Sequence, residues 1–308
     1  MRNLSQELLD IIGKPKSFEF DKYCELVKTY DRGDYTVEVY HQANGKGMYQ
    51  RLFIAIPKGK KYPLPAVVIP YYFPEGMLGY NPETNEALDY YEPVNYMHQL
   101  VLRGYVVASA DAIHMTYLGV NQKENFEPWI DEDAALWQAA GEAITSDFPE
   151  WTGLGKLVYD TSLMIDRVAS DDRVDSSKIA IFGHSLGGIM SFVTGCVDSR
   201  VKVILSSDFG MDWDRNNWCD IWYFGDKLNK VKELGLSTSH LLEYAAPKPY
   251  MLIAGYYDND DSFEIMKSAK GYSDNPERLG FINHATGHRP PKNIVEQGYK
   301  FLEKWLNM

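Results

Sequence analysis

The chain has 308 residues, a hydrophobic content of 45% and a formal net charge of −12. This length fits one large α/β domain, and the acidic balance argues against a nucleic-acid partner. No apolar run approaches the length of about 18 residues that a membrane-spanning helix needs, so no membrane partner is expected. Cys24, Cys196 and Cys219 lack CxxC spacing, which indicates reduced thiols in a cytoplasmic protein.

The N-terminal part of the chain changes its hydrophobic period near residue 34. Residues 1–30 carry an apolar face at helical spacing and are expected to form a helical extension. Residues 35–40 then alternate between apolar and polar side chains, which predicts a half-buried strand. A turn at Asn44-Gly45-Lys46-Gly47 leads to a second strand over 49–56. These two strands are expected to form an antiparallel pair at an edge of the sheet.

Strands and helices alternate along the rest of the chain. Strands are expected at 65–70, 105–110, 179–182, 201–206, 249–254 and 281–283, and helices at 94–103, 156–170 and 291–306. This alternation predicts an α/β fold with a mostly parallel sheet and helices on both faces. No linker divides residues 1–308, so a single domain is expected. The stretches 112–155 and 207–246 read as insertions, which commonly serve as lids or binding loops.

The segment Gly183-His184-Ser185-Leu186-Gly187 follows directly on the apolar strand over 179–182. It has the Gly-x-Ser-x-Gly pattern of a nucleophile elbow, a sharp turn between a strand and a helix. Small residues on both sides of Ser185 make room for this turn. The serine hydroxyl should stand above the sheet, and the backbone N–H of Leu186 should be able to bind an oxyanion. His184 is expected to pack or hydrogen-bond inside the elbow and could face a substrate.

A nucleophilic serine needs a base, usually histidine, and a carboxylate that orients the base. When the chain order is serine, carboxylate, histidine, the carboxylate follows a strand beyond the elbow. Asp258 comes soon after the strand expected over 249–254 and is the predicted acid. Asp260 and Asp261 are close enough to take its place.

The base is expected between the last strand and the last helix. His288 lies there, and Gly287 allows a loop to project its side chain. His284, four residues earlier, is the alternative. The other histidines are not spaced as metal ligands, so neither a metal nor another cofactor is predicted.

Aromatic residues occupy the places where a substrate is expected to bind. The loop after the strand over 65–70 should provide a second oxyanion donor, either a backbone N–H of Tyr72 or Phe73 or the hydroxyl of Tyr71 or Tyr72. Trp213 and Trp218 lie in the second insertion and are predicted to bind substrate together with Tyr71 and His184.

Further motifs accompany the elbow. They are Gly104-Tyr105-Val106-Val107 with Asp111, Leu154-Gly155-Lys156 leading to Asp160, Asp171 to Asp175, Ala246-Pro247-Lys248-Pro249, and Gly287-His288 with Pro290. In these motifs the chain resembles the α/β-hydrolase superfamily from about residue 35 onward, and within it the acetyl xylan esterase and dienelactone hydrolase-like branch. The resemblance implies a triad of Ser185, Asp258 and His288. The His-Gly dipeptide that many esterases carry in the oxyanion loop is missing.

These features predict a serine ester hydrolase that acts through an acyl-enzyme. The excess of aromatic residues suggests small acyl, acetyl-like esters of sugars or aryl alcohols as the small-molecule substrate. Self-association is left open. Two alternatives are a serine peptidase of the prolyl oligopeptidase kind and a non-catalytic binding protein on the same scaffold.

Overall fold

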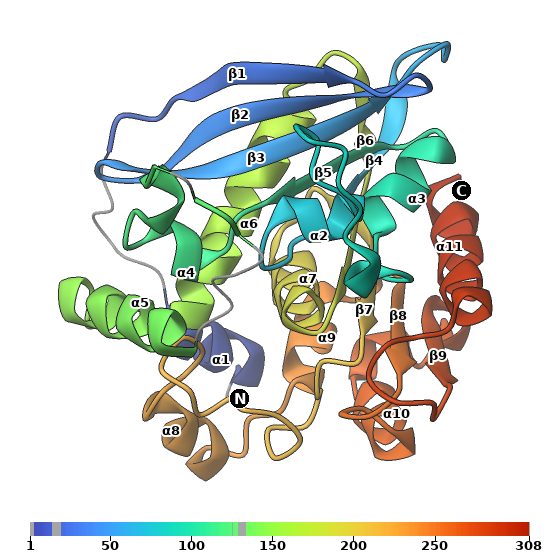
Figure 1. Ribbon diagram of the computed structural model, residues 1–308. Helices are drawn as coiled ribbons and strands as arrows, with labels where there is room; N and C mark the ends of the chain where they lie inside the picture. Colours follow the sequence, from blue (N-terminus) through green and yellow to red (C-terminus); the bar gives the residue numbers. More distant parts are fainter. Residues whose placement is uncertain (1–2, 14–19, 125, 129–133, 308) are drawn as a thin grey trace.

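The computed structural model describes residues 3–13, 20–124, 126–128 and 134–307 (Figure 1). All named strands belong to one nine-stranded sheet with the order β1-β2-β3-β5-β4-β6-β7-β8-β9. The strands are β1 (Cys24–Asp31), β2 (Tyr35–Gly45), β3 (Met48–Pro57), β4 (Leu64–Val68), β5 (Val106–Ala110), β6 (Val174–His184), β7 (Val201–Ser207), β8 (Tyr250–Ala254) and β9 (Leu279–Asn283). This is the mostly parallel α/β sheet that the sequence predicts.

Eleven α-helices and four short 3-10 helices connect and cover the strands in the described part of the chain. The α-helices are α1 (Leu4–Ile12), α2 (Pro74–Leu78), α3 (Tyr96–Leu102), α4 (Ile113–Thr116), α5 (Ala134–Asp147), α6 (Gly153–Ala169), α7 (Leu186–Val197), α8 (Lys227–Glu233), α9 (Ser239–Ala245), α10 (Asp260–Lys267) and α11 (Lys292–Leu306). The 3-10 helices are η1 (Asp89–Tyr91), η2 (Val120–Gln122), η3 (Lys270–Tyr272) and η4 (Pro276–Arg278).

The pairing mode changes once across the sheet, from antiparallel to parallel at β5. Strands β1, β2, β3 and β5 pair antiparallel with one another, whereas β5, β4, β6, β7, β8 and β9 pair in parallel. Every residue of β5 and of β8 is buried, which is typical of parallel strands that are covered on both faces. The carboxyl ends of the parallel strands therefore meet at one edge of the sheet, where ligands bind in open α/β folds.

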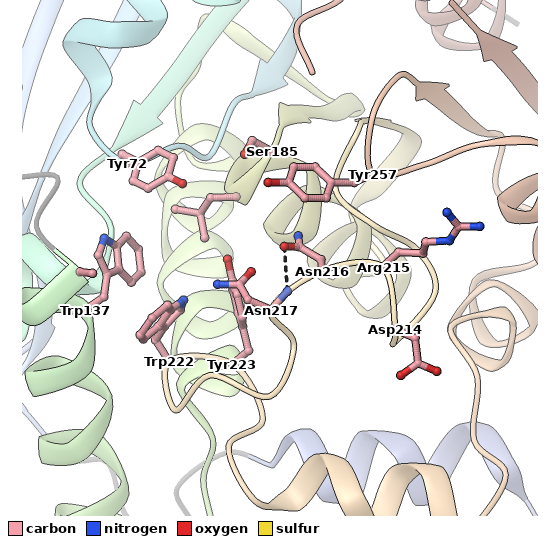
Figure 2. Close-up of a pocket in the computed structure, with 12 residues that line it drawn as sticks. Tyr72, Trp137, Ser185, Asp214, Arg215, Asn216, Asn217, Trp222, Tyr223 and Tyr257 are labelled. Atoms are coloured by element: carbon pink, nitrogen blue, oxygen red, sulfur yellow. Dashed lines mark hydrogen bonds between the residues drawn. The ribbon is translucent and has the colours of Figure 1, made fainter. Parts of the chain in front are cut away.

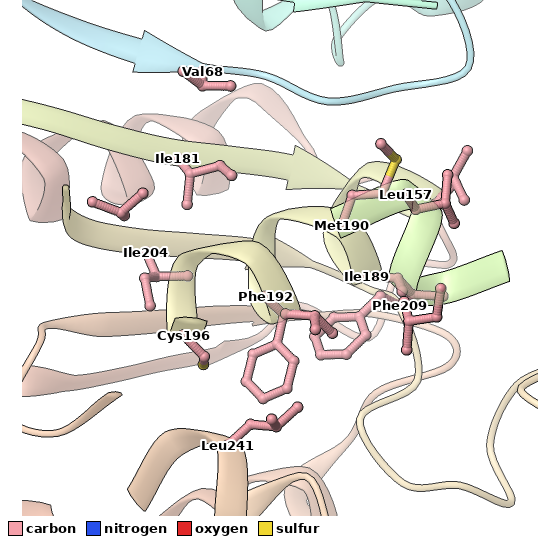
Figure 3. Packing of buried hydrophobic residues seen from close by; sticks show 14 of the residues in the cluster. Val68, Leu157, Ile181, Ile189, Met190, Phe192, Cys196, Ile204, Phe209 and Leu241 are labelled. Carbon is pink, nitrogen blue, oxygen red and sulfur yellow. The ribbon is translucent and has the colours of Figure 1, made fainter. Parts of the chain in front are cut away.

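Two hydrophobic cores lie on opposite faces of the sheet. Neighbouring side chains of β6 reach both of them, because Ile181 belongs to one core and Phe182 to the other. On the first face, α7 is buried from Leu186 to Cys196, and Figure 3 shows Phe192 of this helix beside Leu241 of α9. This packing fixes the start of α7, and with it the end of β6, in the middle of the molecule.

The predicted helical extension over 1–30 is wrong for residues 24–30, and residues 14–19 of it lie outside the described part of the chain. Helix α1 ends at Ile12, and residues Cys24–Asp31 form β1 on the outside of the predicted antiparallel pair. Side chains on both faces of β1 are exposed, so the strand shows no apolar period. Backbone pairing with β2, rather than burial of a hydrophobic face, holds this strand in place.

The two predicted insertions contain helices. Residues 112–155 include α4, η2 and α5 and the start of α6, and residues 207–246 include α8 and α9. None of the described helices combines the length and the apolar character that a membrane crossing requires.

Candidate active site

Ser185 occupies the sharp turn that its sequence motif predicts. It lies between β6 and α7 with φ 58° and ψ −122°, a backbone conformation that L residues rarely adopt and that costs about 1–3 kcal/mol. A Cβ atom on Gly183 would lie 2.0 Å from the carbonyl oxygen of Gly187, and one on Gly187 would lie 2.2 Å from that of Pro70. Both flanking glycines are therefore needed for the turn to close.

His288 is held by an aspartate at the end of β7. The Nδ1 atom of His288 lies 2.6 Å from the Oδ2 atom of Asp208, whose side chain is fully buried. The imidazole also packs against His184, the residue before the serine, with 4.4 Å between the ring centroids. Because Nδ1 faces a carboxylate, the proton of the neutral ring belongs on Nδ1, and Nε2 is left as the basic atom.

The second carboxylate oxygen of Asp208 is enclosed by backbone donors. Oδ1 accepts N–H bonds from Gly255, Tyr256, Tyr257 and Asp258 at 3.0, 2.8, 2.9 and 3.0 Å. Such a ring of N–H groups forms a small anion-binding nest. The nest fixes which of the two carboxylate oxygens faces His288.

Asp258 is predicted to be the partner of His288, but Asp208 takes that position and Asp258 bonds to other groups. Its buried carboxylate accepts N–H bonds from Phe209, Gly210 and Met211 at 2.8, 2.9 and 2.7 Å. The hydroxyl of Ser262 donates a further bond at 2.9 Å. Burial raises the pKa of Asp258, and these donors oppose the rise. The carboxylate of Asp258 thus binds the backbone of residues 209–211, which follow Asp208. In return, the backbone of residues 255–258 binds the carboxylate of Asp208.

The other candidates for acid and base also contact different partners. Asp260 accepts a bond from Asn283, and the exposed Asp261 pairs with Arg215. The Nδ1 atom of His284 lies 2.8 Å from the hydroxyl oxygen of Thr286. Of the two histidines proposed from the sequence, His288 is the one that is hydrogen-bonded to Asp208.

A cavity of about 620 Å³ opens beside Ser185 (Figure 2). Its lining residues are Tyr72, Ala134, Trp137, Ser185, Leu186, Asp214, Arg215, Asn216, Asn217, Trp222, Tyr223 and Tyr257. Both insertions contribute, because Trp137 belongs to α5 and the residues from 214 to 223 belong to the loop after β7. Figure 2 shows Tyr72 and Tyr257 on two sides of Ser185, with their hydroxyl groups directed into the space between them.

The tryptophans that line the cavity are not the ones that the sequence analysis predicts to bind substrate. Trp213 and Trp218 are 9% and 0% exposed, and their indole N–H groups bond to the carbonyl oxygens of Leu236 and Gly210. Neither residue belongs to the lining, so their predicted contact with substrate gains no support from the cavity. Trp137 and Trp222 line the cavity instead, with 6.2 Å between their ring centroids.

Two further predicted binding residues are buried behind the cavity. The ring of Tyr71 packs against Tyr72, Phe73 and Tyr91. His184 is 1% exposed, and its Nδ1 atom lies 3.1 Å from the hydroxyl oxygen of Ser207. Neither Tyr71 nor His184 lines the cavity. Both support the residues that do.

The predicted oxyanion donors lie at the cavity or next to it. Leu186 is the first residue of α7, where the N–H groups have no partner within the helix, and it lines the cavity. Tyr72 also lines the cavity, and its carbonyl oxygen accepts a 3.0 Å bond from the N–H of Ala112. Phe73 is fully buried at the start of α2.

A buried ion cluster holds the loop that carries Tyr72. Arg51 of β3 bonds to Glu75, in the first turn of α2, at 2.7 Å. It also bonds to Asp111, at the end of β5, at 2.8 Å. Asp111 is followed by Ala112, the residue that holds the Tyr72 carbonyl. The guanidinium thus ties together both segments that position Tyr72.

His114 supports the cavity wall from behind. Its ring stacks on Trp137 with 4.1 Å between the ring centroids. It also makes a T-shaped contact with Tyr72, with 6.0 Å between the centroids. Burial lowers the pKa of His114 to about 3, so the ring is neutral at physiological pH. Among the residues that the structure describes, no group of three or more His, Cys, Asp or Glu side chains is arranged to hold a metal ion.

Comparison with known proteins places the chain among hydrolases of this fold. The chain is 22% identical to the Bacillus subtilis (strain 168) protein YtaP, which carries the name of a hydrolase, over 272 residues that cover 81% of each chain. A glucuronoyl esterase from Solibacter usitatus superposes with a TM-score of 0.73 at 14% identity, covering 97% of this chain and 90% of that one.

Other solved structures have the same architecture. A glucuronoyl esterase from Teredinibacter turnerae T7901 gives a TM-score of 0.69 at 16% identity over 97% of this chain and 83% of that one. An acetyl xylan esterase from Paenibacillus sp. R4 gives 0.58 at 18% identity over 98% and 91%. At such identities the likeness establishes the α/β-hydrolase fold alone.

Residues 155–308, half of the chain, match the model of the prolyl oligopeptidase family. The matched half contains Ser185, Asp208 and His288. The chain therefore belongs to the prolyl oligopeptidase family and is a serine hydrolase with the α/β-hydrolase fold.

Proposed function

We propose that this serine hydrolase cleaves carboxylic esters with a triad of Ser185, His288 and Asp208. The observation that carries the proposal is the 2.6 Å bond from His288 to the buried Asp208, beside a strained serine that lines the cavity. Together they provide a nucleophile, a base and a carboxylate that orients the base.

In the proposed reaction, the Oγ atom of Ser185 bonds to the ester carbonyl carbon and its proton passes to Nε2 of His288. The tetrahedral intermediate then releases the alcohol, which takes the proton from His288. A water molecule repeats the sequence on the acyl-enzyme, giving the acid and free Ser185. Asp208 stays ionised throughout and stabilises the imidazolium.

Two groups are suited to bind the negative charge on the carbonyl oxygen. The N–H of Leu186 lies at the positive end of α7, which favours an anion. Tyr72 supplies the second donor in this proposal, and its backbone is fixed by Ala112. Loss of one oxyanion donor typically lowers kcat by about 100- to 1,000-fold.

The lining of the cavity supports small acyl esters of sugars or aryl alcohols as substrates. Five of its twelve lining residues are aromatic, namely Tyr72, Trp137, Trp222, Tyr223 and Tyr257, and polar side chains from 214 to 217 lie beside them. Flat rings beside polar groups suit a sugar or aryl alcohol better than an extended alkyl chain. The relatives named as glucuronoyl and acetyl xylan esterases agree with ester chemistry.

A chain-length series of p-nitrophenyl esters together with acetylated xylo-oligosaccharides tests this function. We expect acetyl esters to be hydrolysed fastest, and Ser185→Ala to abolish both turnover and labelling by a fluorophosphonate. A preference for acyl chains of about eight carbons or more would contradict the small-acyl proposal, because such chains need a long apolar site.

A peptidase is the second candidate, and the family match favours it. An amide substrate uses the same serine, histidine and aspartate, so the catalytic geometry does not separate the two reactions. An aminoacyl or prolyl arylamide assay does. Turnover of the arylamide with a kcat/KM above that of the acetyl ester would establish the peptidase.

A further inference from the structure

Strand β1 leaves one edge of the sheet exposed. It is the first strand in the sheet order, and β2 is its one partner among the described residues. Seven of its eight residues are exposed. Three large hydrophobic side chains lie close together here, with Tyr23 46%, Leu26 49% and Val27 43% exposed. Its outer backbone groups are a ready template for another strand.

A bulge in β1 determines which side chains share a face. Leu26 lies opposite Tyr40 and Lys28 opposite Val39, so Val27 is an extra residue in the pairing with β2. Glu25 lies opposite His41, two positions from Val39 on β2. Because alternate residues of a strand share a face, Glu25 and Lys28 project from the same face although three positions separate them.

The charges on this strand are arranged to match those of an antiparallel copy. We propose that two copies of this chain form a dimer by pairing their β1 strands antiparallel, about a two-fold axis at Leu26 and Val27. In this register Glu25 of each copy faces Lys28 of the other. The bulge makes the register consistent, since residues directly opposite must project from one face of a sheet.

The neighbouring positions fit the same register. Tyr23 of one copy faces Tyr30 of the other, and Cys24 faces Thr29. The pairing of these residues with β2 shows that the two members of each pair project from the same face of the sheet. Aromatic pairs and opposite charges directly across two strands are the favourable combinations in sheets. Leu26 of each copy faces Val27 of the other across the axis, which covers apolar surface that the monomer exposes.

Charged residues often protect an edge strand from pairing, but here their order is self-complementary. Within one chain, Lys28 already pairs with the exposed Glu83. That surface pair is screened by water and does little to hold Lys28 away from a second copy. One strand pair is smaller than the interfaces of permanent dimers, so we expect an equilibrium that dilution shifts toward monomer.

Exchange of the two charges tests the dimer with the full chain. Glu25→Lys places two lysines opposite each other, and Lys28→Glu places two glutamates opposite each other. Each single variant should weaken dimerisation roughly tenfold, because two opposite-charge pairs become two like-charge pairs. The double variant should recover the dimer. An equimolar mixture of the single variants should also recover it, as a heterodimer.

Sedimentation velocity over a dilution series measures these dimers. Glu264→Lys and Lys267→Glu make the same changes in net charge on the exposed face of α10 and serve as matched controls. Hydrolytic activity should be unchanged in every variant, since none contacts the cavity, so activity also reports that each variant is folded. A wild-type monomer at every concentration, a dimer indifferent to the exchange, or equal effects in the controls would each overturn the proposal.

Discussion

Replacing Asp208 by asparagine is the sharpest test of the catalytic assignment. The substitution keeps size and shape and exchanges one carboxylate oxygen for an NH2 group. Four backbone N–H groups surround the Oδ1 position, so the amide oxygen must take that place. The NH2 group then faces Nδ1 of His288, at the position that is now 2.6 Å away.

An NH2 donor at that position reverses the tautomer of the histidine. Nδ1 must accept a hydrogen bond, the ring proton moves to Nε2, and Nε2 can no longer take the proton of Ser185. The analogous change in a serine protease lowers kcat about 10⁴-fold. A loss of this size corresponds to about 5.4 kcal/mol of transition-state stabilisation. We expect kcat for p-nitrophenyl acetate to fall by about this factor in Asp208→Asn, with little change in KM.

Asp258→Asn is the matched control. Its amide would turn a donor toward at least one of the N–H groups that now bond to the carboxylate. An unsatisfied buried donor costs about 1–3 kcal/mol of folding stability. We therefore expect a lower unfolding free energy by chemical denaturation, and a fall in kcat far smaller than in Asp208→Asn. The reverse order of the two kcat losses would refute the reasoning.

Three further predictions follow from the geometry of the elbow and of the cavity wall. Ser185→Gly should abolish turnover and raise the unfolding free energy by about 1 kcal/mol, because glycine adopts a positive φ without strain; a destabilised variant would show that the turn is not strained. Trp137→Ala should raise KM for an acetylated sugar at least about tenfold, while kcat on p-nitrophenyl acetate changes little; equal effects on both substrates would exclude a role in binding the sugar. His114 has a folded-state pKa of about 3, below its unfolded value, so its contribution to stability is present above pH 6.5 and is lost as pH falls. Between pH 6.5 and 5 this loss is about 2 kcal/mol, and denaturation of His114→Phe should lack that component.

The elbow could be predicted because its cause is local. The glycines at 183 and 187 lie beside Ser185 in sequence, and the turn cannot close with larger residues there. The acid could not be assigned in the same way. Asp208 and Asp258 follow neighbouring parallel strands, and both lie at the edge of the sheet that His288 approaches. The hydrogen bonds that each carboxylate makes in the folded protein determine which aspartate contacts the histidine, and the spacing of the two residues in the sequence does not.

The cavity wall was harder to predict than the fold for a similar reason. Trp213, Trp218 and Trp222 lie within ten residues of one another in an irregular loop, where no hydrophobic period separates inward from outward positions. Hydrogen bonds from the indole groups of Trp213 and Trp218 anchor those rings in the core. Strand β1 was missed because it is exposed on both faces and so lacks the alternation that marks a half-buried strand.

The loop after Asp208 and the loop before Asp258 are held by reciprocal hydrogen bonds. These bonds position the catalytic carboxylate independently of the residues that line the substrate cavity. A long segment that shapes the cavity follows Asp208 in the chain. The carboxylate of Asp208 accepts hydrogen bonds from the backbone of residues 255–258, which lie after that segment. Asp258 in turn secures only the first three residues after Asp208. The side chains of this segment that line the cavity can therefore vary without loss of the bonds that hold the acid, whereas α9 is needed for its packing against α7. Substrate range could diverge, in evolution or in the laboratory, around an unchanged catalytic centre.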